Sequence, residues 1–220
     1  RLVTGGADGQ AVAFRHALIQ DVAYQSLLRS RRRRLHQSVA DALLELRPET
    51  AETQPELLAY HLTEAGLPDR ALVLWHRAGD RALGRYASDE AVRHFEKGVE
   101  VARQLSGGED ASTVLDSLIR LGHAQRAASW LPLAIATFHD VFNQARAAGD
   151  VPRLVEAALG YDRSEFNSSD TRNSSAALLQ EALTLTGETP DSPERCRLMV
   201  SLTRAHIMSG KHEAAEKQGR

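Results

Sequence analysis

Hydrophobic residues recur along this chain at intervals of three and four, which is the period of an amphipathic helix. Leu154, Ala158 and Leu159, for example, fall on one face of a helix. Glycine and proline separate the apolar runs: Gly149 follows one run, and Pro152 stands in the first turn of the next. The pattern predicts an all-α fold whose helices follow one another through short turns.

Two helical hairpins repeat with a constant offset of 43 residues. The matched positions are Gly79 and Gly122, Ala91 and Ala134, and Phe95 and Phe138. Gly, Ala and Phe at this spacing are typical of the tetratricopeptide repeat. We expect each glycine to let the second helix of its hairpin approach the first, and each phenylalanine to fill the gap between hairpins.

The repeat extends beyond these two hairpins. Leu159-Gly160 begins a third copy, and Met199, Leu202 and Ala215 begin a fourth. The predicted fold is therefore a tetratricopeptide-like α-α superhelix, a helical-hairpin solenoid. Its repeats are expected at about 55–105, 111–148, 151–186 and 194–220, the last one truncated.

Residues 1–47 follow a different pattern and predict a separate domain before the repeats at 48–220. A short strand is expected at 11–15, followed by helices at about 17–28 and 30–46. In the first of these helices, Leu18 and Val22 lie on one stripe. The apolar positions of the second helix are Leu35, Val39, Ala42, Leu43 and Leu46.

The composition is that of a globular chain, with 42% hydrophobic and 25% charged residues. A net charge of −2 argues against a general nucleic-acid binder, although residues 1–47 are basic. One cysteine, Cys196, excludes an internal disulfide framework and a cysteine-based zinc site. No apolar run is long enough for a membrane span, and the N-terminus does not have the pattern of a signal peptide. We therefore expect a cytoplasmic location and no membrane partner.

The sequence offers no catalytic residue and no metal site. It has nine histidines, but they do not form a pair or cluster at metal-ligand spacing. A phosphate loop is missing, because Gly5-Gly6-Ala7-Asp8-Gly9 has no lysine. The sequence also lacks a nucleophile elbow and the order of a serine triad. We therefore expect this chain to be non-catalytic and to hold no cofactor of its own.

Two polar segments allow more than one interpretation. The run Arg29-Ser30-Arg31-Arg32-Arg33-Arg34 is read as a solvated helix start, as a contact for a phosphate or acidic domain, or as a DNA contact. The stretch 164–175 is longer than a repeat turn requires. It is either a flexible insertion or a loop that contacts a ligand.

Several motifs resemble bacterial signal-transduction ATPases with numerous domains. They are Phe14-Arg15-His16-Ala17-Leu18-Ile19-Gln20-Asp21, Arg34-Leu35-His36-Gln37-Ser38-Val39-Ala40 and Ala71-Leu72-Val73-Leu74-Trp75-His76-Arg77-Ala78-Gly79. The resemblance implies that residues 1–47 are the end of a winged-helix lobe behind an ATPase core. It also implies that His16 approaches the β-phosphate of ATP or ADP held by the parent protein.

The resemblance also implies a function for the repeats. Carrying the family's groove spacing onto this register places six residues inward: His76, Asp80, His123, Arg126, Tyr161 and Glu165. We expect a non-catalytic sensor or scaffold arm that binds a protein, a peptide segment or a small ligand and regulates an attached signalling ATPase. The partner can also be the parent's own ATPase or effector domain. The alternatives are a regulatory fragment of a class III adenylate/guanylate cyclase, the sensor region of a LuxR-type activator, or a spacer between domains.

Overall fold

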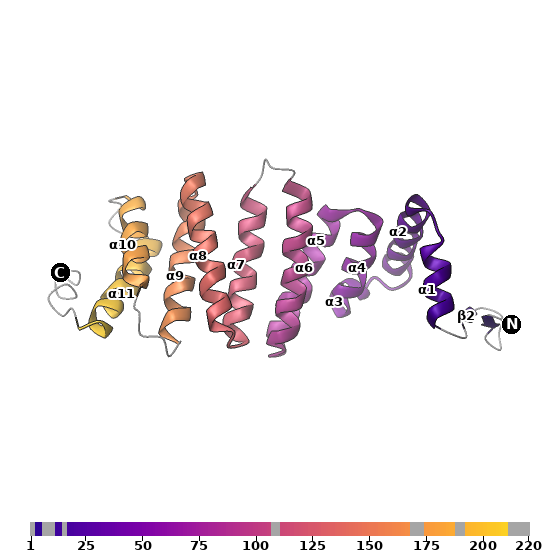
Figure 1. The fold of residues 1–220 in the computed structure, drawn as a ribbon, viewed down its shortest axis with the longest axis horizontal. Helices are drawn as coiled ribbons and strands as arrows, with labels where there is room; N and C mark the ends of the chain where they lie inside the picture. The colour runs from indigo at the N-terminus through magenta and orange to yellow at the C-terminus, as the bar shows by residue number, and fades with distance from the viewer. Residues whose placement is uncertain are drawn as a thin grey trace. The chain divides into compact units, whose positions relative to one another are not determined.

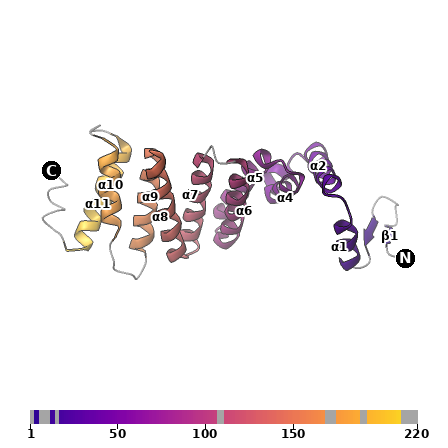
Figure 2. The same ribbon diagram turned by 45° about the horizontal axis from the view of Figure 1, so that its top comes forward.

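The computed structural model describes residues 3–5, 12–14, 17–106, 111–167, 174–187 and 192–210. Within these ranges the chain divides into two compact units, Arg1–Ala71 and Leu72–Arg220. The described residues form eleven helices and a short hairpin of two strands. Figures 1 and 2 show how these elements follow one another within each unit. The all-α repeat fold predicted from the hydrophobic pattern is confirmed.

The first unit begins with an antiparallel pair of strands, β1 (Val3–Gly5) and β2 (Val12–Phe14). Its helices are α1 (Ala17–Gln25), α2 (Arg29–Leu46), α3 (Thr50–Thr53) and α4 (Pro55–Ala65). The strand and the two helices predicted for this region are present, although α1 ends three residues earlier than expected. Strand β1 was not predicted. His16 lies outside the described residues.

Histidines hold α2 against α4. His36 is buried on α2, and its Nδ1 lies 2.9 Å from Nδ1 of His61 on α4. The hydroxyl of Tyr24 lies 2.9 Å from the other ring nitrogen of His36. Because of this packing, the compact unit extends past the boundary predicted at residues 47 and 48. The identity of residues 1–47 as a winged-helix remnant stays a prediction.

The second unit is an array of helical hairpins. Helix α5 (Pro68–Gly84) enters it, and its helices continue as α6 (Ser88–Ser106), α7 (Ala111–Ala127), α8 (Leu131–Ala148), α9 (Val151–Phe166), α10 (Ser175–Leu185) and α11 (Pro193–Met208). In both views α7, α8 and α9 stand side by side. One continuous apolar core runs from Ala82 to Ala205 through the interior of this array.

Local signals set several helix ends. Gly66 and Gly149 adopt the left-handed conformation, with φ of 75° and 67°, and each ends the helix before it. At the start of α9, the side chain of Asp150 accepts a hydrogen bond from the backbone N–H of Arg153 at 3.2 Å. The positions of Gly149 and Pro152 agree with the sequence analysis, and Gly66 and Asp150 mark further helix ends in the same way.

The glycines of the repeat face phenylalanine rings, as expected. A Cβ on Gly79 would lie 2.5 Å from the ring of Phe95, and one on Gly122 would lie 2.8 Å from the ring of Phe138. Gly160 differs from the prediction, because its Cβ would lie 2.3 Å from the same Phe138. Phe138 belongs to α8, the second helix of the preceding hairpin. Gly122 and Gly160 therefore both lie against one ring at the junction of two hairpins.

The prediction of a loop over residues 164–175 was partly wrong. Residues up to Phe166 continue helix α9, and α10 begins at Ser175. Residues 168–173 lie outside the described ranges, as do Ala215 and the remaining residues predicted to belong to the fourth repeat. Among the described residues, no helix combines the length and the apolar character needed to cross a membrane.

Candidate partner-binding groove

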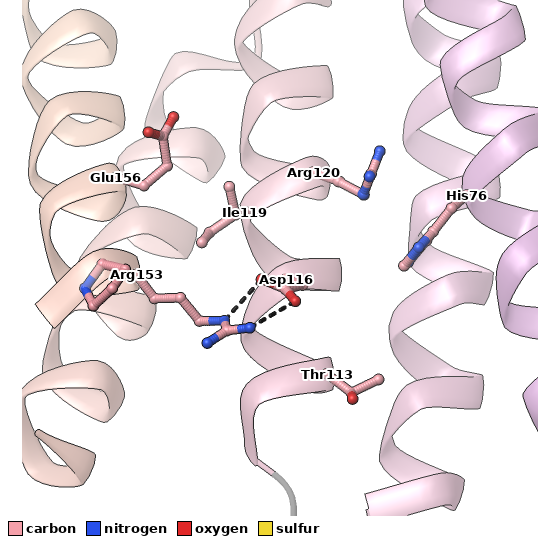
Figure 3. Close-up of a pocket in the computed structure, with 8 residues that line it drawn as sticks. His76, Thr113, Asp116, Ile119, Arg120, Arg153 and Glu156 are labelled. Atoms are coloured by element: carbon pink, nitrogen blue, oxygen red, sulfur yellow. Dashed lines mark hydrogen bonds and ion pairs between the residues drawn. The ribbon is translucent and has the colours of Figure 1, made fainter. Parts of the chain in front are cut away.

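A groove of about 630 Å³ opens on the first helices of three successive hairpins. Its lining residues are His76 from α5, Thr113, Asp116, Ile119 and Arg120 from α7, and Pro152, Arg153 and Glu156 from α9. Figure 3 shows these side chains with the ion pair between Arg153 and Asp116 at the centre. A surface built from first helices is the arrangement expected of a tetratricopeptide-like concave face.

Ion pairs join neighbouring first helices along this surface. Arg120 of α7 donates to both carboxylate oxygens of Asp80 on α5, each at 3.0 Å. Arg153 of α9 donates to the two oxygens of Asp116 on α7 at 2.7 and 2.8 Å. The same guanidinium reaches Asp150 at 2.6 Å. Its pKa is raised, above all by the hydrogen bonds to Asp116. Arg153 therefore stays charged, and these hydrogen bonds hold both guanidinium groups in place.

The hydrogen bonds of His76 define its tautomer. Ser117 donates its hydroxyl proton to the carbonyl of Thr113 at 2.9 Å, so its oxygen must accept from His76 Nε2 at 3.0 Å. The pKa of His76 is lowered, first by burial and then by the nearby charge of Arg120. At neutral pH the groove therefore presents a neutral imidazole with an unprotonated Nδ1.

Three of the predicted groove residues lie at or near this groove. His76 lines it, while Asp80 pairs with its lining residue Arg120. His123 Nε2 lies 3.2 Å from Glu156, and this hydrogen bond is the main cause of the lowered pKa of that carboxyl. The groove therefore includes the first turns of α7 and α9, which the register read from the sequence had left out.

The other predicted residues lie toward the ends of α7 and α9. Arg126 has a buried Nε that meets no hydrogen-bond partner among the described residues. Tyr161 and Glu165 are buried, which the prediction of an inward polar face did not anticipate. The role of these three side chains in partner binding stays a prediction.

Glu165 has a structural task at the start of α10. Its carboxylate accepts from the backbone N–H groups of Ser174 and Ser175 at 2.8 and 2.9 Å. It also accepts from the Ser174 hydroxyl at 2.7 Å, and Tyr161 meets that hydroxyl at 2.7 Å. A carboxylate at this position accepts hydrogen bonds from N–H groups that have no partner within the helix, and it interacts favourably with the positive N-terminal end of the helix dipole. Tyr161 and Glu165 therefore link the end of α9 to the start of α10 through hydrogen bonds.

Sequence reasoning missed most of the lining residues. Asp116, Arg120 and Arg153 were not singled out, although a signal for them is present. An acidic residue on one first helix is followed by an arginine on the next, after 40 residues for Asp80 and Arg120 and after 37 for Asp116 and Arg153. Within the described part of the chain, no three metal-ligating side chains come together.

Comparison with known proteins identifies the fold. The structure resembles a putative kinesin light chain of Podosopora anserina with nearly identical TPR-like repeats, with a TM-score of 0.58, 17% identity and coverage of 86% of this chain and 92% of that one. It also resembles BtubC (BKLC) from P. vanneervenii, with a TM-score of 0.51, 16% identity and coverage of 92% and 88%. The tetratricopeptide-like repeat fold is thereby established.

Sequence comparison adds one relative. No family model matches the chain. An uncharacterized protein of Rhizobium meliloti (strain 1021) is 34% identical over 113 residues, which is 51% of this chain and 11% of that protein. The matched region is therefore a small part of a much longer relative.

Proposed function

We propose that this chain binds an extended segment of a protein partner in the groove formed by α5, α7 and α9. The observation that carries the proposal is the composition of the groove, which takes its lining from three consecutive first helices. Tetratricopeptide-like repeats generally present such concave surfaces to other proteins. The chain acts here as a binding arm and performs no chemistry itself.

The side chains of the groove support a peptide ligand. Arg120 and Asp116 are half-exposed, so a bound segment can reach both a guanidinium and a carboxylate. Ile119 and Pro152 add apolar surface between these charges. A backbone with side chains of alternating character can use both kinds of contact, whereas a small ion cannot.

A displayed library of random peptides tests the proposal. We expect selection on the purified chain to enrich related sequences, and the enriched peptides to bind in solution. Arg120→Glu should weaken that binding at least about tenfold, because it places a carboxylate beside Asp80 and removes a groove donor.

Arg146→Glu is the matched control. Arg146 also donates to an acid on a neighbouring hairpin, Glu181 at 3.4 Å, but it joins second helices and is absent from the groove lining. The two arginines have similar exposure, 43% for Arg120 and 51% for Arg146. Equal effects of the two variants, or no enriched peptide at all, would refute groove binding.

We further propose that the arm regulates a signalling ATPase in a longer polypeptide. The support is the resemblance of residues 14–40 and 71–79 to signal-transduction ATPases, together with the much greater length of the relative. A cyclase or a LuxR-type regulator as the attached effector rests on the same resemblance. No nucleotide step belongs to this chain, which has no phosphate loop.

The test of this second proposal uses the full-length parent. His16→Ala should weaken ADP binding about tenfold and raise the basal output of the attached effector, since a charge-assisted contact contributes on the order of 1.5–3 kcal/mol. Equal ADP affinity and equal basal output in both proteins would reduce His16 to a structural residue.

A further inference from the structure

Helix α2 carries an apolar face that its own unit leaves exposed. Leu35, Val39 and Leu46 are 47%, 41% and 79% exposed, and Leu28, directly before the helix, is 76% exposed. We call these four residues the outer stripe. They are spaced by seven, four and seven residues, so they lie within about 40° of one another around the helix.

A neighbouring side of α2 is already occupied by α4. His36 and Ala40 are buried, and His36 contacts His61 of α4. Tyr60 of α4 is 47% exposed and stands edge-on to His36, with ring centres 5.6 Å apart. Its ring therefore extends the apolar surface along the border between α2 and α4. Of the apolar positions named for this helix from the sequence, Leu35, Val39 and Leu46 are therefore exposed.

The spacing of the outer stripe suits the binding of another helix against it. Apolar residues at alternating intervals of three and four, or their sums, form the seam of a coiled coil. A contiguous exposed apolar surface of this kind marks an interaction site. Charged residues at the edge of the seam then decide which helix binds and in which direction.

Those charges make the stripe complementary to itself. Arg31, Ser38 and Glu45 follow one another at seven-residue intervals on the border away from α4. In an antiparallel pair of α2 helices, Arg31 meets Glu45 of the partner subunit, and Ser38 meets its own copy. The same register sets Leu35 against Val39 of the partner subunit and Leu28 against Leu46 of the partner subunit. A parallel pair places Arg31 level with its own copy instead.

We propose that two copies of this chain associate through the outer stripe, with their α2 helices antiparallel. A single pair of helices gives an interface at the small end of the range for specific complexes. The expected dissociation constant is therefore on the order of micromolar. This association uses α2 and α4 and is independent of the groove on α5, α7 and α9.

Sedimentation equilibrium of the 220-residue chain, from low to high micromolar concentration, tests the proposal. We expect a monomer–dimer equilibrium that Val39→Glu abolishes, because it places a carboxylate in the centre of the seam. Gln37→Glu is the matched control: it adds the same charge on the exposed side of α2 turned away from the stripe, and it should leave the equilibrium unchanged. Circular dichroism confirms that each variant keeps its helix content.

A charge swap keeps the test decisive if Val39→Glu disturbs folding. Arg31→Glu and Glu45→Arg should each weaken the dimer about fivefold to tenfold, since each turns two attractions into repulsions. The double variant should recover the original affinity. A chain that stays monomeric at every concentration, a Val39→Glu variant that dimerises normally, or a double variant weaker than both single ones would overturn the proposal.

Discussion

Replacing Gly160 by alanine tests the packing at the junction of two hairpins. The added Cβ would lie 2.3 Å from Cε1 of Phe138, closer than carbon atoms approach in proteins. The ring has little room to move, because it also lies close to Gly122, where an added Cβ would be 2.8 Å away. Phe138 is also fully buried. The backbone of α9 or α8 must therefore shift.

Two opposing effects set the magnitude. Overpacking of a tight core costs about 1–3 kcal/mol, and the short distance to a fully buried ring favours the upper part of that range. Alanine in a helix interior regains about 0.5–1 kcal/mol over glycine. Gly160→Ala should therefore destabilise the chain by about 2 kcal/mol. For a domain of this size, that is a fall in Tm of about 4–8 °C.

Urea unfolding followed by circular dichroism measures this effect, with Gly84→Ala as the control. A Cβ on Gly84 meets nothing within 4 Å, so this variant should be neutral or slightly stabilising. Combining Gly160→Ala with Phe138→Leu should relieve the clash and give less destabilisation than the sum of the two single variants. A Gly160→Ala protein as stable as the wild type, or strictly additive effects, would refute the proposed contact.

Three further predictions concern buried polar groups. Burial acts to raise the pKa of Glu165, but hydrogen bonds from Ser174 and Ser175 lower it overall. Glu165→Gln should therefore reduce the free energy of unfolding by about 1–3 kcal/mol, measured in urea at pH 7. This difference from the wild type should shrink as pH falls through the lowered pKa. Asp162 is 4% exposed and pairs with Arg204, and burial raises its pKa. Arg204→Gln should consequently destabilise more than Asp162→Asn, since it leaves a buried carboxylate without its cation, and equal losses would contradict this reasoning. The pKa of His61 is lowered from 6.5, first by burial and then by His36. The unfolded chain therefore binds more protons than the folded one, and stability should fall as pH drops below about 6.5. His61→Asn should flatten the dependence of stability on pH, and an unchanged dependence would mean that other groups cause it.

The sequence predicted those features that depend on neighbouring residues. Gly66 and Gly149 end their helices because only glycine readily adopts the left-handed conformation found there. The 43-residue offset located the hairpins, since Phe95 and Phe138 fill equivalent spaces in each. Such features follow from a few adjacent positions, so no knowledge of the tertiary arrangement is needed.

Features that depend on how helices turn relative to one another were not predicted. Gly160 faces Phe138 of the preceding hairpin because α9 packs on α8, and periodicity alone does not reveal that partner. Glu165 was assigned to the groove, yet its carboxylate accepts from the first backbone N–H groups of α10. The groove itself includes the first turns of α9, where Arg153 reaches α7.

The ion pairs between first helices differ in how accessible they are along the array. Asp80, Asp116 and Asp162 each pair with an arginine on the following first helix, Arg120, Arg153 and Arg204. The carboxylates of Asp80 and Asp116 are 55% and 51% exposed, so water already screens their ion pairs. Breaking either pair in favour of a charged ligand would therefore cost little free energy. Asp162 is nearly inaccessible, and separating it from Arg204 would leave a charge in the protein interior. Under the proposed function, a partner's charged side chains would exchange with the exposed pairs on α5, α7 and α9, while the buried pair between α9 and α11 would stay intact.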